Sequence, residues 1–432
     1  MRTSLALFAL MVFSWSLSAM AQGTNQTTEL MPDCSVAAGS LPDSHRPIGQ
    51  EDLQNPIRHV IVIMQENHSF DNYFGKLDET GYHGIVDGLN NAHQSSSYHE
   101  QSFCFDNLVH DWDTLHRSWN HGKNDGFPAG RPFGYYDESD LNFYYSMAKR
   151  FAIGDRYFGS VMSPTFPNRM FMMAATSDGE TDNSRNPKFW FRNHRTIFDV
   201  MSENHVSWKY YFGNLPAFGL LPRSLFRNLS HLHFMKKFKK DLAKADLPSV
   251  IFLDHSLFLN EEPPKNPQLG QQAVAQRIKD LVGSQYWKDS VVFFTYDEDG
   301  GFYDHVAPPR ACAPDDTPAK LKSTQPQGDF TLYGFRVPFI AISPYVKSHY
   351  VSHQIFDHTS ILKYIETKFN LPALSRRDAN ANGFEDIFDY EHPNFEVALP
   401  EALLDQGKSN MCKEAARPNP QDYLNPDNYN DE

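Results

Sequence analysis

The sequence predicts an α/β fold in which helices cover a mainly parallel central sheet. One observation is a set of short apolar runs, rich in Val, Ile and Phe, that contain no regular polar alternation. Such runs are typical of strands that are buried on both faces. The other observation is that longer segments with helical spacing separate these runs. Alternating strands and helices indicate a layered α/β domain.

The predicted strands are the four clearest apolar runs. Their sequences are VIVIM (60–64), SVIFL (249–253), SVVFFTY (290–296) and VPFIAIS (337–343). Each run is short and rich in β-branched and aromatic residues, which suits a strand covered on both sides of a parallel sheet. We therefore expect these four runs to form the centre of the fold.

Four segments between and after these runs have the spacing of helices: 108–122, 141–151, 270–284 and 358–369. The segment 270–284 is the clearest, because Gln, Arg, Lys and Asp lie opposite a stripe of apolar residues. The stripe consists of Ala273, Val274, Ile278, Leu281 and Val282. It predicts an amphipathic helix that covers one face of the sheet.

The N-terminal part of the chain is predicted to lie outside the α/β domain. Arg2, the apolar block 5–15 and the small-x-small sequence 19–21 are typical of a signal peptide over residues 1–21, cleaved near Ala21. The apolar block is shorter than the roughly 20 residues that span a bilayer. Residues 22–55 are expected to form an N-terminal arm, and residues 56–432 a single catalytic domain. The mature protein is therefore expected to be secreted, either extracellular or periplasmic.

Composition and cysteine content restrict the partners and the compartment. The chain has 432 residues, 40% of them hydrophobic, and a formal net charge of −14, which argues against nucleic acid as a partner. A small molecule or a lipid is the favoured partner. Export into an oxidising compartment favours two disulfide bonds among Cys34, Cys104, Cys312 and Cys412, but the sequence leaves their pairing open.

Two of the predicted strands are followed directly by acidic and amide side chains. VIVIM leads to Glu66 and Asn67, and SVVFFTY leads to Asp297 and Glu298. Ligands of parallel sheets lie beyond the carboxyl ends of the strands. Three carboxylates brought to one edge repel one another unless a cation neutralises them. The pattern predicts a divalent metal site, the alternative being acids that cap helices or line turns.

A third segment, SPTFPNR (163–169), offers a hydroxyl group at the expected start of a helix. Pro167 fits the first helical turn, which places Thr165 near the helix N-terminus, where N–H groups favour an alkoxide and a phosphate. The alternatives are an ordinary Thr N-cap and Ser163 as the reactive hydroxyl. His110, His305 and His358 are the histidines that could supply hydrogen bonds or a proton.

Four motifs in this order resemble a known family. ENHSFDNYFG, SPTFPNR, TYDEDGGFYDHVAPP and DHTSILKYIE are similar to motifs of the bacterial and plant phosphoesterase family that contains non-haemolytic phospholipases C and AcpA-type acid phosphatases. The similarity runs from about residue 56 to about residue 390. It implies an alkaline-phosphatase-like three-layer α/β sandwich, a hydroxyl nucleophile and a metal.

The resemblance also implies roles for individual residues. Glu66, Asn67, Asp297 and Glu298 would hold the metal together with the oxygen of Thr165, the nucleophile. His110, His305 and His358 would contact the phosphoryl oxygens or protonate the leaving group, with His305 as the favoured acid. One or more divalent ions are expected, zinc first, although hard oxygen ligands also suit Ca, Mg or Mn.

One segment departs from the family pattern. Family members commonly have a histidine in an NDxHPP-like segment, whereas this chain reads LNEEPP with Glu262 at the matching place. An added acid disfavours further negative charge on the substrate, or contributes to binding a cation. His255, slightly upstream, is the residue that could replace the missing histidine.

The predicted function is a secreted phospholipase C that cleaves phospholipids through a phosphothreonine intermediate, with phosphatidylcholine as the expected substrate. The resemblance implies this function because the phospholipase branch of the family has Thr at this position. The alternatives are a broad acid phosphatase acting on monoesters and, in a different class, a non-catalytic exported protein that binds a cation. The basic segment 218–242 could rest on a membrane surface, or form a helix whose lysines face solvent. The oligomeric state stays open.

Overall fold

A central sheet of eight strands organises the computed structural model, in which residues 31–80, 88–89, 97–183 and 194–405 are described. The strand order is β11-β4-β10-β9-β1-β8-β6-β7. The strands span His59–Gln65 (β1), Ala152–Gly154 (β4), Trp208–Phe212 (β6), Leu232–Phe234 (β7), Val250–Asp254 (β8), Ser290–Tyr296 (β9), Phe339–Ile342 (β10) and Tyr350–Ser352 (β11). Two further pairs lie outside this sheet: β2 (Tyr98–His99) with β3 (Gly134–Tyr135), and β5 (Tyr157–Phe158) with β12 (Phe356–Asp357).

Strand β1 lies at the centre and is parallel to both of its neighbours, β8 and β9. β6 is parallel to β8 and to β7, whereas β10 is antiparallel to β9 and to β4. The sheet is therefore mainly parallel, which confirms the predicted fold class. The expectation that VPFIAIS is one of the parallel strands is wrong. No helix lies between β9 and β10 among the described residues, so the chain re-enters the sheet from the edge at which β9 left it.

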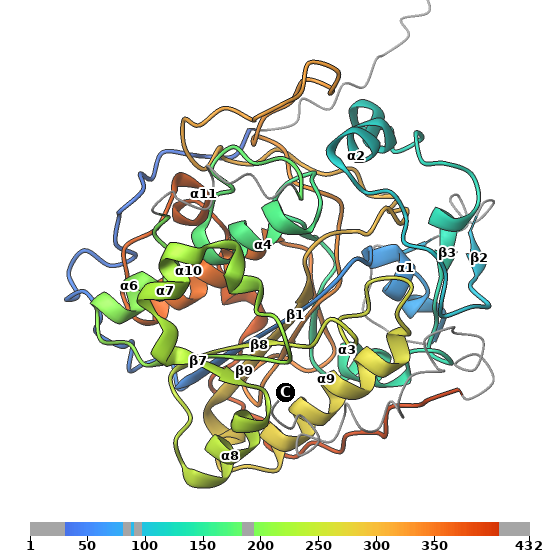
Figure 1. Cartoon of the computed structure of the whole chain (residues 1–432). Helices are drawn as coiled ribbons and strands as arrows, with labels where there is room; N and C mark the ends of the chain where they lie inside the picture. Colours follow the sequence, from blue (N-terminus) through green and yellow to red (C-terminus); the bar gives the residue numbers. More distant parts are fainter. Residues whose placement is uncertain (1–30, 81–87, 90–96, 184–193, 406–432) are drawn as a thin grey trace, which may run out of the picture. The chain divides into compact units, whose positions relative to one another are not determined.

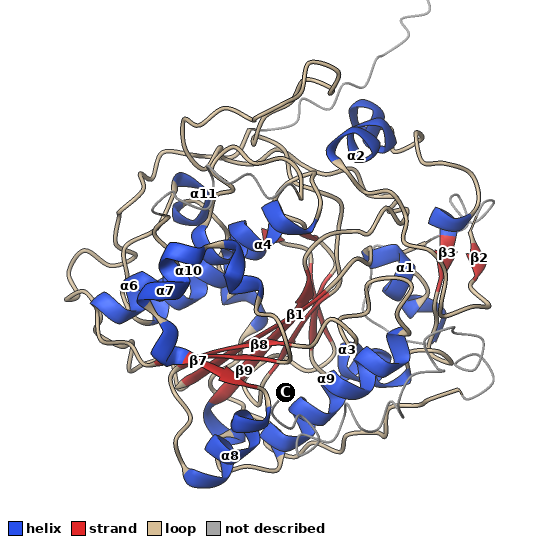
Figure 2. Ribbon diagram, viewed as in Figure 1, coloured by secondary structure: helices blue, strands red, loops and turns tan. Residues whose placement is uncertain are grey.

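Helices lie on both faces of the sheet and form the outer layers (Figure 2). One layer contains α4, α6, α7, α10 and α11, and α10 packs against α4 and α11. The other contains α3, α8 and α9, with α9 packed against both α3 and α8. The helices span Phe70–Phe74 (α1), Trp112–Trp119 (α2), Asn142–Arg150 (α3), Thr165–Ala174 (α4), Ile197–Glu203 (α6), Pro222–Arg227 (α7), Lys236–Lys244 (α8), Pro267–Val282 (α9), His358–Lys368 (α10) and Arg376–Ala379 (α11).

Helix α9 shows how the local sequence sets an element and its buried face. Asn266 is its N-cap, with a side chain that accepts from the Gln268 N–H, and Pro267 occupies the first helical position. Four of the five predicted stripe residues are buried, Ala273, Val274, Ile278 and Leu281, whereas Val282 is partly buried against the core. The predicted helix and its buried stripe are therefore confirmed, whereas Gln271 and Arg277, predicted on the opposite polar face, are also buried.

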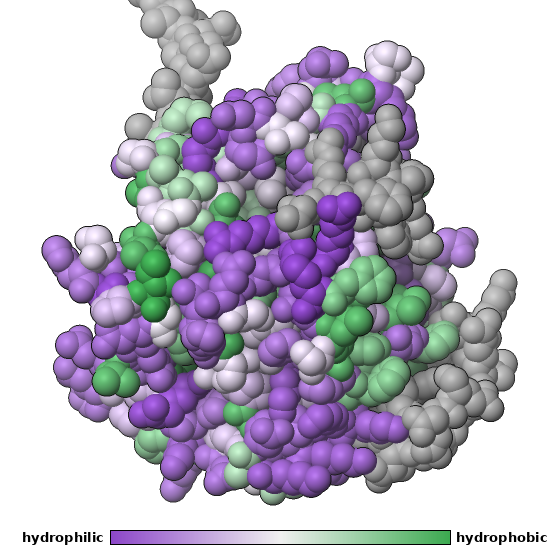
Figure 3. Space-filling view, turned by 60° about the vertical axis from the view of Figure 1, so that its left-hand side comes forward, coloured by the Kyte–Doolittle hydropathy of each residue, from purple (hydrophilic) through white to green (hydrophobic). Residues whose placement is uncertain are grey.

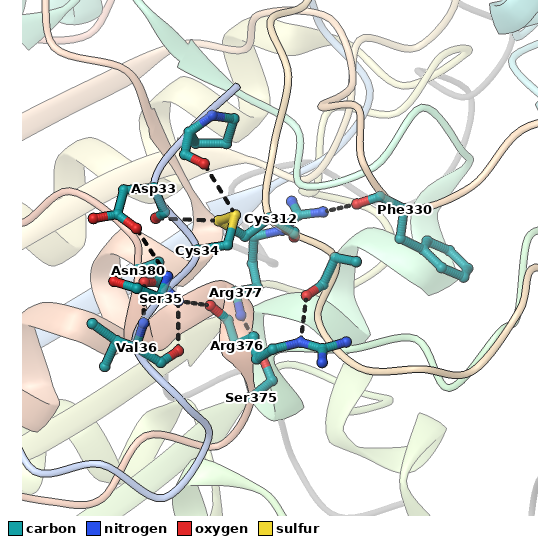
Figure 4. Close-up of a disulfide and its surroundings, with 12 residues drawn as sticks. Asp33, Cys34, Ser35, Val36, Cys312, Phe330, Ser375, Arg376, Arg377 and Asn380 are labelled. Carbon is teal, nitrogen blue, oxygen red and sulfur yellow. Dashed lines mark hydrogen bonds between the residues drawn. A yellow bond between two sulfur atoms is a disulfide. The ribbon is translucent and has the colours of Figure 1, made fainter. Parts of the chain in front are cut away.

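The N-terminal arm is attached to the sheet domain from Met31 onward. A disulfide joins Cys34 to Cys312, with 5.6 Å between the two Cα atoms (Figure 4). The arm also donates backbone hydrogen bonds from Gly39 to Ala373 and from Asp52 to Lys368. Cys104 is disulfide-bonded as well. The predicted signal peptide, residues 1–21, and Cys412 lie outside the described residues.

The basic segment 218–242 folds into short elements that end in α8. Phe238 and Leu242 are buried on one side of α8, whereas Lys239 and Lys240 are exposed on the other. This is the arrangement of a helix whose lysines face solvent. Figure 3 shows apolar and polar surface interspersed on the face that it draws. Within the described residues, no helix combines the length and the apolar character needed to cross a membrane.

Candidate active site

The carboxyl ends of β1 and β9 bring four of the predicted site residues together. Gln65 pairs with Tyr296 in the parallel register, so the segments that follow, 66–67 and 297–298, leave the sheet side by side. The backbone N–H of Asn67 donates to Asp297 Oδ1 at 3.2 Å. The structure therefore places Glu66, Asn67, Asp297 and Glu298 in one cluster, as their positions after the strands predicted.

Asn67 adopts a left-handed backbone conformation at this junction. Its φ is +66°, a region that few residues other than glycine occupy, and the residue is fully buried. Gly300 makes room for it, because a Cβ on Gly300 would lie 2.2 Å from the Asn67 carbonyl oxygen. Backbone strain of this kind is concentrated at functional sites.

Burial dominates the electrostatics of the cluster. It raises the pKa of Glu66 to about 8 and that of Asp297 to about 6, although the Arg169 guanidinium acts in the opposite direction on both. Burial, together with the negative charges of Asp297 and Asp299, raises the pKa of Glu298 well above its usual range. Three neighbouring carboxyl groups thus share a buried site in which Arg169 offsets part of their negative charge.

Two buried oxygen atoms of the cluster fit a cation. Asn67 Oδ1 and Glu298 Oε1 have no hydrogen-bond partner among the described residues, and an unsatisfied buried polar atom is costly. His110 Nε2 lies 3.4 Å from Glu298 Oε1 and 3.3 Å from Asn67 Nδ2. Carboxylate and amide oxygens are the ligands that hard divalent cations prefer. The donor chemistry of the four residues therefore suits a divalent metal ion, but the ligand atoms of Glu66, Asp297 and Glu298 do not all lie within 4.8 Å of one another, so these side chains would have to move closer to bind one ion together.

His110 lies directly beside this cluster. Its Nδ1 is 2.7 Å from the carbonyl oxygen of Leu108, which accepts the Nδ1 proton and leaves Nε2 directed at Asn67 and Glu298. Burial lowers the pKa of His110, so the neutral form is favoured. The raised pKa of Glu298 favours its protonated form, which can donate to His110 Nε2, and the Asn67 amide NH₂ is a second donor within reach.

Arg169 is the site residue that sequence reasoning missed. It is almost fully buried in α4, with Nη2 3.0 Å from Glu66 Oε1 and Nε 3.1 Å from Asp297 Oδ2. Nη1 lies 3.6 Å from Asp254 Oδ1, at the end of β8. One guanidinium thus connects three strand ends. The only signal in the sequence is its position four residues after Thr165, which puts both residues on one face of the helix.

Thr165 is the first residue of α4 and is 8% exposed. The N-cap residue is Pro164, so the alternative of an ordinary Thr N-cap is wrong. The N–H of Phe166 already donates to Asn183 at 2.8 Å. Ser163, the rival hydroxyl, is fully buried and donates to the Thr181 carbonyl oxygen at 2.7 Å. Of the two hydroxyl groups, Thr165 is the better placed to react.

His305 is held by a carboxylate rather than by the metal-ligand cluster. Its Nδ1 and its backbone N–H both lie 2.8 Å from Asp71 Oδ2. A histidine whose second nitrogen is fixed by a carboxylate is a common arrangement for a general acid or base. Sequence analysis assigned no specific role to Asp71, whereas in the structure its carboxylate contacts both the ring and the backbone N–H of His305.

Asp71, Asp304 and His305 also lie close enough to share a cation, as do His99, Asp137 and Asp140. In the first group, however, the fully buried Arg336 already pairs with both acids, at 2.9 Å from Asp71 and 2.8 Å from Asp304. The guanidinium supplies the positive charge that a metal would otherwise bring. Arg169 pairs in the same way with Glu66 and Asp297, so a guanidinium alone does not separate the two groups. We prefer the cluster at β1 and β9 because Asn67 Oδ1 and Glu298 Oε1 are buried there without a hydrogen-bond partner among the described residues.

His358, predicted as a catalytic residue, is fully buried at the start of α10. Its Nε2 donates to the Asp297 carbonyl oxygen at 2.7 Å, and its Nδ1 lies 3.2 Å from the Tyr157 hydroxyl. Burial lowers its pKa to about 3. These contacts suit a neutral histidine that holds the backbone of Asp297 in position through its carbonyl oxygen. A direct catalytic role for His358 stays a prediction.

Glu262 lies near the cluster, at the position where the family resemblance led us to expect a histidine. It pairs with Lys265 at 2.6 Å, and its Oε1 accepts from Asn107 Nδ2 at 3.0 Å. Its charge contributes to raising the pKa of Glu66. His255, the suggested replacement, lies 3.0 Å from Gln65 Oε1 and belongs with the residues that support β1.

A second residue missed by the sequence analysis, Glu261, is fully buried behind the cluster. Its carboxylate accepts hydrogen bonds from Tyr296, Gln65, Tyr73 and Tyr144, at 2.5 to 2.8 Å. Gln65 and Tyr296 immediately precede Glu66 and Asp297. Glu261 therefore connects the two strand ends that deliver the candidate metal ligands.

Comparison with known proteins places this site in a family. The model of the phosphoesterase family matches residues 57–372, which contain the whole cluster, Thr165 and the three histidines. This chain belongs to the phosphoesterase family. It is therefore a phosphoric ester hydrolase, and the alternative of a non-catalytic cation-binding protein is not supported.

The curated relatives of this phosphoesterase include several phospholipases C. Phospholipase C B of Mycobacterium tuberculosis is 30% identical over 416 residues, covering 78% of each chain. Non-specific phospholipase C1 of Arabidopsis thaliana is 32% identical over 406 residues, covering 82% of this chain and 75% of its own. Non-hemolytic phospholipase C of Pseudomonas aeruginosa is 29% identical, covering 88% and 63%.

Solved structures resemble this phosphoesterase only distantly. The lipoteichoic acid synthase LtaP from Listeria monocytogenes is 10% identical with a TM-score of 0.44, covering 81% of this chain and 80% of its own. A protein in the alkaline phosphatase superfamily from Vibrio parahaemolyticus is 11% identical with a TM-score of 0.39, covering 92% and 91%.

Proposed function

We propose that this phosphoesterase is a secreted, metal-dependent phospholipase C that hydrolyses phosphatidylcholine to diacylglycerol and phosphocholine. The observation that carries the proposal is the connection between Thr165 and the carboxylate cluster. Thr165 begins α4, and Arg169, one turn later in the same helix, contacts Glu66 and Asp297. The names of the relatives, phospholipases C from bacteria and a plant, support the choice of a phospholipid substrate.

In the first step, Thr165 Oγ1, as the alkoxide, forms a bond to phosphorus while the bond from phosphorus to the glycerol oxygen breaks. His305, oriented by Asp71, donates its proton to that oxygen, and diacylglycerol leaves. In the second step, water attacks the phosphothreonine and gives a proton to His305. Phosphocholine departs, and Thr165 and His305 return to their starting forms.

The remaining site residues position these groups. Glu66, Asn67, Asp297 and Glu298, with the Thr165 oxygen, would hold a divalent ion, zinc in our proposal. Such an ion supplies positive charge that lowers the pKa of the threonine hydroxyl and stabilises charge on the phosphoryl oxygens. His110, beside Asn67 and Glu298, is placed to contact a phosphoryl oxygen.

The charge of the site favours diesters over monoesters. Glu262 places a carboxylate close to Glu66, at the position where the family resemblance implies a histidine, and Lys265, 2.6 Å from it, offsets part of that charge. A phosphomonoester carries up to two negative charges and a phosphodiester one, so the extra acid disfavours the monoester more. Rates on p-nitrophenyl phosphate and p-nitrophenyl phosphorylcholine separate the two functions. A faster rate on the monoester would support the acid phosphatase alternative instead.

Export is part of the proposal and is supported by the disulfide bonds. Cys34 is bonded to Cys312, and Cys104 is also bonded, which suits an oxidising compartment. The proposed partners are the phospholipid substrate and, transiently, the membrane surface that presents it.

Replacement of Thr165 by Ala tests the mechanism. We expect kcat on phosphatidylcholine and on p-nitrophenyl phosphorylcholine to fall by about 10³-fold or more, because the nucleophile is lost. Thr165→Ser should restore part of the rate, since it keeps a hydroxyl group. Ser163→Ala is the matched control and should retain most of the activity. Full activity in Thr165→Ala would refute the mechanism.

A further inference from the structure

A cavity of about 770 Å³ adjoins the candidate active site and has no role in the chemistry described above. Its size lies within the roughly 300–1,000 Å³ typical of sites for small ligands. We propose that this cavity receives the glycerol and acyl part of the phospholipid, that is, the diacylglycerol leaving group. The proposal rests on the phospholipase function proposed above and assigns the binding site for the apolar half of the substrate.

The walls of the cavity continue into the catalytic residues. Leu108 and Val109 line it and lead directly to His110. Gly301 lines it a few residues after Asp297 and Glu298, and a Cβ at Gly301 would lie 2.9 Å from the Val109 carbonyl oxygen. Only glycine allows these two segments to come so close, and its φ of +76° also favours glycine.

The loop that carries the proposed acid forms part of the same wall. Gly301 and Pro132 line the cavity, and the N–H of Tyr303 donates to the Pro132 carbonyl oxygen at 2.9 Å. His305 follows two residues later. The segments that lead to His110 and His305 thus form part of the cavity wall. We therefore place the leaving group in this cavity, where His305 would protonate the departing oxygen.

The lining favours acyl chains over a charged group. Most of it is apolar: Phe105, Leu108, Val109, Pro128, Ala129 and Pro132. Val109 is 64% exposed, and a substrate in the cavity would cover it.

The positive charge in the wall is already compensated. Arg131 lies 3.0 Å from Glu100 Oε2, and its guanidinium stacks 4.5 Å above the Phe105 ring. It is therefore not set up to attract a phosphate. Asn107 donates to Glu262, which fixes a further polar side chain of the wall. Asp106, which also lines the cavity, could attract a trimethylammonium head group. The experiment must therefore distinguish binding of the head group from binding of the diacylglycerol part.

Ala129→Trp tests the proposal, because Ala129 is exposed in a loop of the cavity wall and a tryptophan there would fill the cavity without disturbing the core. Ala38→Trp, an equally exposed alanine on the N-terminal arm, is the matched control. Two readouts are compared in the full-length protein. One is kcat/KM on long-chain phosphatidylcholine relative to kcat/KM on p-nitrophenyl phosphorylcholine. The other is binding of dioctanoylglycerol, followed by calorimetry, which needs no turnover.

We expect Ala129→Trp to lower the ratio of lipid to soluble-diester activity at least tenfold and to weaken dioctanoylglycerol binding by a similar factor, while Ala38→Trp changes neither. An equal fall on both substrates would assign the cavity to the head group and overturn the proposal, as would an unchanged ratio with unchanged binding. If the wild type cleaves no phosphodiester yet binds dioctanoylglycerol in a way that Ala129→Trp weakens, the acyl site stands and the proposed function fails.

Discussion

The buried carboxylate of Glu261 offers a sharp test of how the active site is held in place. Its two oxygens accept four hydrogen bonds: Tyr73 and Tyr296 donate to Oε2, and Gln65 and Tyr144 donate to Oε1. Burial raises the pKa of all three tyrosines well above the usual range, so they remain neutral donors. The informative change is Glu261→Gln, which keeps the shape of the side chain and leaves no cavity.

The expected cost follows from the hydrogen-bond count. A glutamine amide has one oxygen and one NH₂ group in place of the two carboxylate oxygens. The amide oxygen can accept from one pair of donors, but the NH₂ group cannot accept from the other pair. Two buried donors lose their acceptor, at about 1–3 kcal/mol each, partly offset because a buried charge is removed. We therefore expect the free energy of unfolding to fall by about 2–4 kcal/mol.

Activity should fall as well, because Gln65 and Tyr296 directly precede Glu66 and Asp297. Urea unfolding and kcat on p-nitrophenyl phosphorylcholine measure the two effects, and a loss of kcat with little change in KM would indicate misplaced catalytic groups. Glu366→Gln is the matched control: Glu366 is an equally buried carboxyl group in α10 whose pKa burial raises, without such a set of tyrosine donors. Wild-type stability and rate in Glu261→Gln, or equal losses in both variants, would refute this reasoning.

Two further predictions concern the metal and the arm. Metal affinity should rise between about pH 5 and pH 8 with release of protons, because burial raises the pKa of Asp297 to about 6 and of Glu66 to about 8, and both must be deprotonated to bind. Calorimetry in buffers of different ionisation enthalpy measures the released protons, and a pH-independent affinity would contradict the assignment. In the metal-free protein, the free energy of unfolding should fall as pH rises through this range. The reason is that the raised pKa values leave the folded carboxyl groups with more bound protons than the unfolded ones. Replacing Cys34 and Cys312 by serine should lower the free energy of unfolding by about 2–4 kcal/mol, since the bridge closes a long loop. Urea unfolding tests this, and wild-type stability would show that the bridge contributes nothing.

Local patterns in the sequence were sufficient to predict the central strands and the residues that follow them. VIVIM and SVVFFTY became β1 and β9, and their carboxyl ends bring Glu66, Asn67, Asp297 and Glu298 together. This prediction succeeds because burial on both faces leaves an unbroken apolar run, and because parallel strands end at a common edge. The three-residue strands β4, β7 and β11 carry no such signal, since their pairing comes from neighbours distant in the chain.

The sequence by itself determined the α/β class, the inner strands, the position of Thr165 at the start of a helix and the acids at the sheet edge. Only the tertiary structure decided the direction of β10, the pairing of Cys34 with Cys312, and the roles of Arg169, Asp71 and Glu261. The physical reason is that a periodic pattern records which side of an element is buried. The partner of a buried charge depends on which distant segments pack against it, and neither Arg169 nor Glu261 differs locally from an arginine or glutamate that faces solvent.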